Sequence, residues 1–184
     1  MAFLTRRSRV WPARHGWLAL LQVLLGLSVH CHAEEVLLSS TEKELKVAFL
    51  YNFALYTEWP VPLVEGLHLC VLGRDELGTA LEALTTHSIH GKPIVLRRLD
   101  ARADITGCHM VYIAGASDAK SAKTMAELRQ KPILSVKDAT SAEFALISLG
   151  RDGNRLVFDV DNTAAHAIGV TLSSKLLRLA RQVR

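Results

Sequence analysis

Aromatic residues are concentrated in one stretch of the chain, and this stretch constrains the fold more than any other feature. Five of the eleven Phe, Trp and Tyr residues fall between Phe49 and Trp59, and the apolar residues there recur at helical spacing. Ser40 and Thr41 precede the stretch as candidate N-caps. Pro60 disfavours the α conformation for Trp59, so the helix should end at about that residue. The pattern predicts an amphipathic helix that packs a broad aromatic face against a sheet.

A helix that only packs on a sheet would account for this pattern. The side chains of Tyr51, Tyr56 and Trp59 also suit a surface for a ligand or a partner, because Tyr and Trp combine a large apolar area with a polar group. Both interpretations stay open at the level of sequence. The three residues are our candidates for the second one.

The first residues have the composition of an export signal. Four arginines precede an apolar run over residues 17–29, which is too short to span a bilayer comfortably. Cys31 and Ala33 then supply small residues where a signal peptidase requires them. We expect residues 1–33 to be a signal peptide cleaved near Ala33, and residues 34–184 to be the mature domain. Lipidation of Cys31, a twin-arginine export route and a retained N-terminal anchor are the alternatives.

Removal of residues 1–33 changes what the charge implies. The 22 Lys and Arg residues include four Arg of the leader, so the mature chain has 18 basic residues, 18 acidic residues and no formal net charge. No basic patch remains to suggest a nucleic-acid partner. About 150 residues are enough for one domain with a substantial core.

Apolar runs alternate with helical patterns along the mature chain. This alternation predicts a single α/β domain with a mainly parallel sheet, flanking helices and a hairpin near the C-terminus. The expected helix caps are Asp75, Asn162 or Thr163, and Ser173 or Ser174. We expect strands over residues 67–72, 93–99, 108–114, 132–136, 144–149 and 155–160. We expect helices over residues 75–84, 117–130 and 175–181, a helix from 162 that Gly169 interrupts, and a helical turn over 138–143.

Cys70 and Cys108 are the two cysteines outside the leader. An even pair in an exported chain tends to form a disulfide. The geometry allows one if the first and third strands are neighbours, as in a flavodoxin-like sheet. Two buried free thiols are the alternative. A metal site is less favoured, because we place His68 and His109 on the opposite strand faces from the cysteines.

No pattern in the sequence indicates catalysis. The loop at residues 73–78 lacks the third glycine of a dinucleotide-binding fingerprint and the Lys of a P-loop. Asp152, Asp159 and Asp161 lack the spacing of a calcium loop. The chain has no nucleophile elbow and no paired carboxylates in an apolar setting. We therefore expect a protein that is not an enzyme, with no catalytic residue, no cofactor and no metal.

Three motifs resemble those of one protein family. They are KVAFLYNFALYTEWP at residues 46–60, LHLCVLG at residues 67–73 with the later Cys108 and His109, and NRLVFDV at residues 154–160 followed by LSSKLLRLA at 172–180. Together they resemble the YfiR-like family, whose members are periplasmic proteins that restrain a membrane-bound diguanylate cyclase. The resemblance spans about residues 42–181. Some members carry a second cysteine pair in the C-terminal third, and this chain does not.

The resemblance implies a periplasmic protein that binds the periplasmic sensor domain of an inner-membrane diguanylate cyclase and represses it. Lower cyclic di-GMP and less biofilm would follow. The resemblance also implies a homodimer, and a releasing signal such as an outer-membrane lipoprotein or a redox change. The alternative is a periplasmic small-molecule-binding domain without a cyclase partner, in which Trp59 stacks on the ligand.

The closing motif adds three candidate residues. Taken alone, the leucines of residues 172–180 are the packing face of a helix and its arginines are a solvated face. With the resemblance, Ser173, Ser174 and Arg178 become candidates for contact with a partner or a small anionic ligand.

Overall fold

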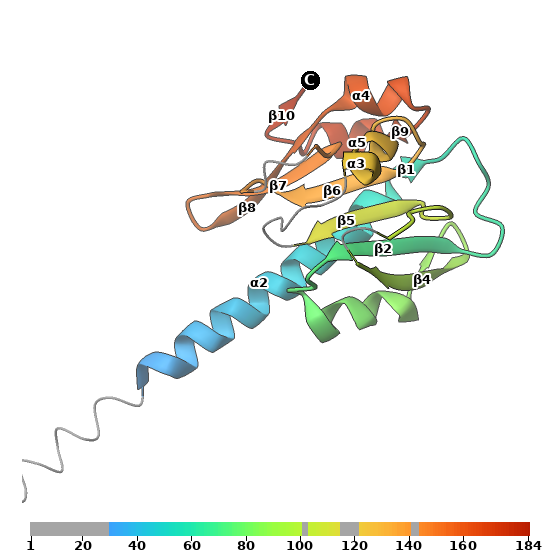
Figure 1. The fold of residues 1–184 in the computed structure, drawn as a ribbon. Helices are drawn as coiled ribbons and strands as arrows, with labels where there is room; N and C mark the ends of the chain where they lie inside the picture. Colours follow the sequence, from blue (N-terminus) through green and yellow to red (C-terminus); the bar gives the residue numbers. More distant parts are fainter. Residues whose placement is uncertain (1–29, 101–102, 115–121, 141–143) are drawn as a thin grey trace, which may run out of the picture. The chain divides into compact units, whose positions relative to one another are not determined.

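The computed structural model describes residues 30–100, 103–114, 122–140 and 144–184 (Figure 1). The chain divides into two units, residues 1–41 and residues 42–184. Most of the predicted signal peptide lies outside the described residues, so its cleavage near Ala33 stays a prediction. No helix in the described ranges is long and apolar enough to cross a bilayer.

Helix α2 (His30–Leu55) contains the aromatic stretch and differs from its prediction at both ends. It does not begin at Ser40 or Thr41, because the described chain is already helical from His30. Glu, Leu and Lys occupy many positions on either side of these hydroxyl residues. Their helix propensity outweighs the capping preference of Ser and Thr. The helix also ends at Leu55, earlier than the prediction at Trp59.

Thr57 explains the early end of α2. Its hydroxyl donates a 2.6 Å hydrogen bond to the carbonyl of Phe53, which satisfies one acceptor of the last helical turn. Thr57 and Glu58 then form strand β1 (Thr57–Glu58), which pairs antiparallel with β9 (Thr171–Leu172). The chain therefore leaves α2 in an extended conformation before it reaches Trp59.

An eight-stranded sheet forms the centre of residues 42–184 (Figure 1). Its parallel strands are, in spatial order, β4 (Lys92–Leu99), β2 (Leu67–Gly73), β5 (Met110–Ala114), β6 (Leu134–Asp138) and β7 (Ile147–Asp152). At the edges, β3 (Ser88–Ile89) is antiparallel to β4, β8 (Arg155–Val160) is antiparallel to β7, and β10 (Gln182–Val183) is parallel to β8. The predicted α/β class, with a mainly parallel sheet and a C-terminal hairpin, is confirmed.

Short helices connect the strands in the described part of the chain. They are the 3₁₀ helix η1 (Gly78–Thr86) and the α-helices α3 (Ala122–Leu128), α4 (Asn162–Ala167) and α5 (Ser174–Leu177). Asp75 accepts hydrogen bonds from the backbone N–H groups of Leu77 and Gly78, where η1 begins. The N-cap residue of η1 is Leu77, so the helix expected from Asp75 begins later than predicted. Ser173 caps α5, as predicted.

Three further predicted elements are corrected by the structure. Asp161, rather than Asn162 or Thr163, caps α4 by accepting from the amide of Ala164 at 3.0 Å. The last helix α5 is a single turn, because the chain after it pairs with β8 as β10. Asp138 does not start a helical turn, since it pairs with β7 as the last residue of β6. The expected helix over 117–130 corresponds to α3, and residues 115–121 lie outside the described ranges.

The sheet has an apolar core on each face. The larger core contains the C-terminal part of α2, residues 47–55, where Phe53 is fully buried between Phe49 and Phe158, with ring centroids 5.8 and 4.9 Å away. The smaller core surrounds Cys70 and Cys108. The inward-facing aromatic residues of α2 are therefore part of the core, and the residues that follow the helix lie nearer the surface.

Candidate functional site

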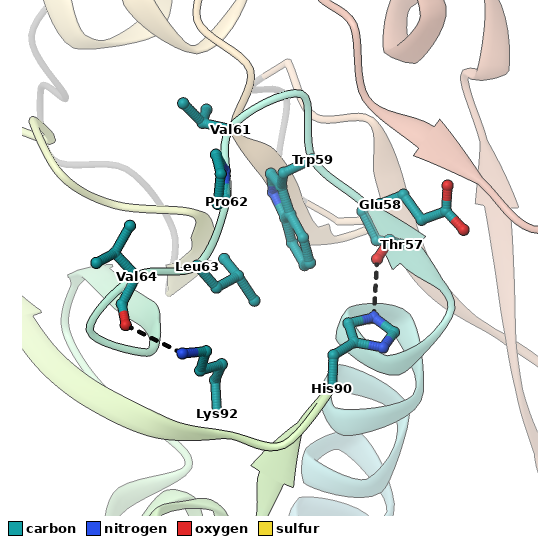
Figure 2. A pocket seen from close by; sticks show the side chains of 9 residues that line it. All are labelled: Thr57, Glu58, Trp59, Val61, Pro62, Leu63, Val64, His90 and Lys92. Carbon is teal, nitrogen blue, oxygen red and sulfur yellow. Dashed lines mark hydrogen bonds between the residues drawn. The ribbon is translucent and has the colours of Figure 1, made fainter.

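The segment after β1 encloses an open cleft of about 630 Å³ (Figure 2). This cleft segment, residues 59–66, lies between β1 and β2, and the turn between β3 and β4 closes the cleft on the other side. The residues that line it are Thr57, Glu58, Trp59, Val61, Pro62, Leu63, Val64, His90 and Lys92.

Apolar side chains form most of the cleft wall. Figure 2 shows the indole of Trp59 and the side chain of Leu63 pointing into the space between the segment and His90. Val61 and Val64 lie on the same segment and are 51% and 74% exposed. Exposed apolar side chains beside a cleft are typical of a surface that binds something.

Polar groups stand at the other side of the cleft. His90 and Gly91 have positive φ angles of 51° and 76° and form the two-residue turn between β3 and β4, a turn that requires this conformation. The turn brings the His90 imidazole to 3.4 Å from the carbonyl of Thr57. Lys92 donates to the carbonyl of Val64 at 3.4 Å. The cleft thus combines apolar walls with a cation and an imidazole.

Contacts with His109 hold the side chain of Trp59 in place. Its indole N–H donates a 2.8 Å hydrogen bond to the carbonyl of His109, and its ring lies edge-on to the His109 imidazole with centroids 6.4 Å apart. The Nδ1 atom of His109 accepts from the backbone amide of His68 at 3.1 Å. The two imidazoles are also perpendicular, with centroids 5.5 Å apart. Trp59 is therefore the first member of a contact chain that reaches β2 and the start of β5.

Burial lowers the pKa of His109, and the neighbouring imidazole of His68 lowers it further. His68 Nδ1 is buried and has no hydrogen-bond partner within the described residues. The expectation that His68 lies on the opposite face from Cys70 is wrong. The two residues are two positions apart in β2, and alternate strand residues share a face.

The structure joins Cys70 and Cys108 in a disulfide, with Cα atoms 5.9 Å apart. The strands are neighbours as the prediction requires, because β2 pairs directly with β5. Both cysteines are buried in the smaller core. The bond therefore links the residues just before β5 to the centre of β2, close to His68 and His109.

The candidate residues from the sequence lie in separate places. Trp59 lines the cleft. Tyr51 packs its half-buried ring on His87, 5.3 Å between centroids. Tyr56 is half-buried against the larger core, and its carbonyl accepts from the amide of Ser173.

Of the remaining two candidates, Ser174 begins α5 and Arg178 is the C-cap residue that follows it. The side chains of Ser174 and Arg178 are exposed and are 3.5 Å apart. Separately, the pairing of β1 with β9 places the end of the aromatic stretch next to the start of the closing motif. A ligand or partner role for any of the six residues stays a prediction.

Sequence reasoning missed most of the cleft. Val61 and Val64 carry no pattern beyond being apolar residues in a loop. His90 precedes Gly91 and Lys92, and a turn signal of this kind between two strands is detectable. No local sequence pattern predicts that this turn lies beside residues about 30 positions earlier in the chain.

No three His, Cys, Asp or Glu side chains of the described residues are grouped so that they could hold a metal ion. The charged residues of a second hollow of about 440 Å³ near the end of β6 are engaged with one another. There Lys46 bonds Asp138 at 3.2 Å, and Arg151 pairs with Glu42.

Two comparisons with known proteins bear on identity. A search of curated proteins gave no match to this chain. The sequence profile of the family described as YfiR/HmsC-like matches residues 43–181, which is most of the chain and nearly all of the unit that contains the sheet and the cleft. The chain belongs to the YfiR/HmsC-like family.

Proposed function

We propose that the protein is a periplasmic regulator that binds the periplasmic part of an inner-membrane diguanylate cyclase and represses it. The observation that carries this proposal is the family match over residues 43–181, since the family is regulatory and acts with such a cyclase. A protein of this kind needs no catalytic group. It needs a surface with different affinities for two states of its receptor.

The cleft supports the proposal with a surface of suitable character. Val61 and Val64 expose apolar area that a partner can bury, and Trp59 provides a large ring anchored by its hydrogen bond to His109. Trp is enriched among the residues that dominate binding energy in protein interfaces. Lys92 at the rim adds a positive charge, which favours a partner segment with an acidic residue next to its apolar ones.

A matched pair of substitutions tests this surface. Val64 and Leu179 are the two most exposed large apolar side chains of the described residues, 74% and 71%, and only Val64 lines the cleft. Neither contributes to the core, so both variants should fold. We expect Val64→Asp to weaken binding to the periplasmic part of the cyclase at least tenfold, about 1.4 kcal/mol.

Leu179→Asp is the control and should leave that affinity unchanged. The measurement is the dissociation constant with purified cyclase in detergent or nanodiscs. An equal loss of affinity in both variants would indicate a general effect of the added charge. A loss of affinity only in Leu179→Asp would indicate that the partner binds at the closing motif and not at the cleft.

A second candidate function is capture of a small molecule. The volume of the cleft, about 630 Å³, lies in the range of ligand pockets, and Trp59 lies on its wall. Ligand-dependent quenching of Trp59 fluorescence without any protein partner would favour this function. The signal of Trp59 is obtained as the difference between the chain and its Trp59→Phe variant, because Trp11 and Trp17 also contribute in the uncleaved chain.

A further inference from the structure

Trp59 connects the cleft to two histidines, His68 and His109, that lie outside it. We propose that His109 is a proton-sensitive contact, which holds Trp59 and the cleft segment in place at neutral pH and releases them in acid. This inference concerns the regulation of the proposed binding site. It rests on the proposed function only for its consequence in the cell.

The bonding of His109 requires a neutral ring. Its Nδ1 accepts from the backbone amide of His68 at 3.1 Å, and an imidazole nitrogen can accept only when it carries no proton. The neutral ring therefore has its proton on Nε2. Protonation adds a proton to Nδ1, so the acceptor is lost and two N–H groups face each other.

Among the described residues, no acidic side chain is a partner of the half-buried His109 imidazole. Burial and the facing imidazole of His68 both lower its pKa, and His68 Nδ1 is itself buried without a partner in the described chain. The charged residues on the elements next to His109 include Lys92, Arg97 and Arg98 of β4, Glu58 of β1, Glu65 of the cleft segment, and Lys131 ahead of β6. Each of them is engaged elsewhere or exposed. Arg97 donates to the carbonyl of Thr106, Lys92 donates to the carbonyl of Val64, and Arg98 pairs with Asp75 and Glu82. Lys131 pairs with Glu127, and both glutamates are exposed.

His109 links the hydrogen bond with the His68 amide to Trp59, because the same residue contacts both. The carbonyl of His109 accepts from the Trp59 indole at 2.8 Å and also from the amide of Leu134 at 3.0 Å. A rotation of His109 away from the His68 amide shifts the ring against which the indole lies edge-on. Residues 59–66 contribute no strand or helix of their own. Their attachments include the packing of Trp59 and Leu63 on the larger core, the Trp59 hydrogen bond to His109, and the Lys92 hydrogen bond to Val64.

The direction of the pH effect follows from the lowered pKa of His109. In the unfolded state the pKa of the imidazole is near 6.5, and in the folded state burial and the neighbouring His68 lower this pKa. The contact therefore contributes fully above about pH 6.5 and is lost as the pH falls through the lowered value. Acid should loosen the cleft before it unfolds the protein.

The test follows Trp59 fluorescence from about pH 7.5 to about pH 4.5, as the difference between the full chain and its Trp59→Phe variant. We expect one transition with a midpoint below 6.5, while circular dichroism stays unchanged. His109→Asn places an amide oxygen near the position of Nδ1 and cannot titrate, so this variant should lose the transition. His166→Gln changes an exposed histidine of α4 and should keep it.

The proposal is overturned if His109→Asn keeps the transition with the same midpoint, if the unaltered chain shows none, or if circular dichroism is lost together with it. The readout needs no partner. Its failure is thus distinct from a failure of the proposed function, which the Val64→Asp comparison tests.

Discussion

Gly66 fixes how the cleft segment joins the sheet. Its φ angle is +136°, a conformation that side chains with a Cβ rarely adopt, and an added Cβ would lie 2.6 Å from the carbonyl of Pro93. Pro93 is the neighbour of the cleft residue Lys92. The absence of a side chain therefore allows the segment to return close to β4 before β2 begins.

Gly66→Ala should lower the free energy of unfolding by roughly 1–3 kcal/mol, because both the backbone strain and the clash oppose it. Gly153→Ala is the matched control, since Gly153 also has positive φ but has nothing within 4 Å of an added Cβ. It should cost less. Urea denaturation measures both values, and an equal loss in the two variants would rule out the contact with Pro93 as the cause.

Among the single residues, Trp59 was predicted from the sequence as a candidate site residue, but the contact that holds its side chain was not. The Trp-Pro pair at the end of the aromatic stretch is a visible local signal. The acceptor of the indole hydrogen bond, the carbonyl of His109, is 50 residues away in the sequence. A backbone carbonyl has no signature in a residue pattern, so this contact could not be predicted.

Among the elements, α2 shows how one helix serves both the core and the site. Its inner aromatic residues form a cluster with β8, while its end delivers Thr57 to β1 and Trp59 to the cleft. The helix was predictable from its period. Its early end was not, because the pairing of β1 with β9 joins residues more than 110 positions apart.

Phe53→Ala should remove about 3–5 kcal/mol of stability, since Phe53 is completely buried between two other rings. Tyr51→Ala on the same helix should cost less, because Tyr51 is only half-buried and contacts the exposed His87. Thermal or urea unfolding compares the two. A cost for Tyr51→Ala equal to that for Phe53→Ala would contradict the assignment of the inner face of α2 to the core.

On the scale of the whole molecule, the alternation of apolar runs and helical patterns predicted the parallel sheet. The disulfide between Cys70 and Cys108 was expected only on the condition that the first and third long strands are neighbours, and the structure meets that condition. Helix starts were less predictable, since several polar residues near Asp161 could cap α4 and only the backbone path selects one.

The disulfide should matter mainly for stability. Its two cysteines are separated by 38 residues, so in the chain-entropy model its loss costs about 3–4 kcal/mol. Cys70→Ser combined with Cys108→Ser should lower the melting temperature and weaken repression. Reductant added to the unfolded chain before refolding should give the same melting temperature as the double variant. Unchanged melting in the double variant would argue that the bond contributes no stability.

The most direct test of the central claim is the intracellular concentration of cyclic di-GMP in a host that carries the inner-membrane cyclase. Our account predicts that deletion of this protein raises the concentration. A copy with residues 1–33 should restore the lower value, and a copy without them, confined to the cytoplasm, should not. An unchanged concentration after deletion, or full restoration by the cytoplasmic copy, would contradict periplasmic repression.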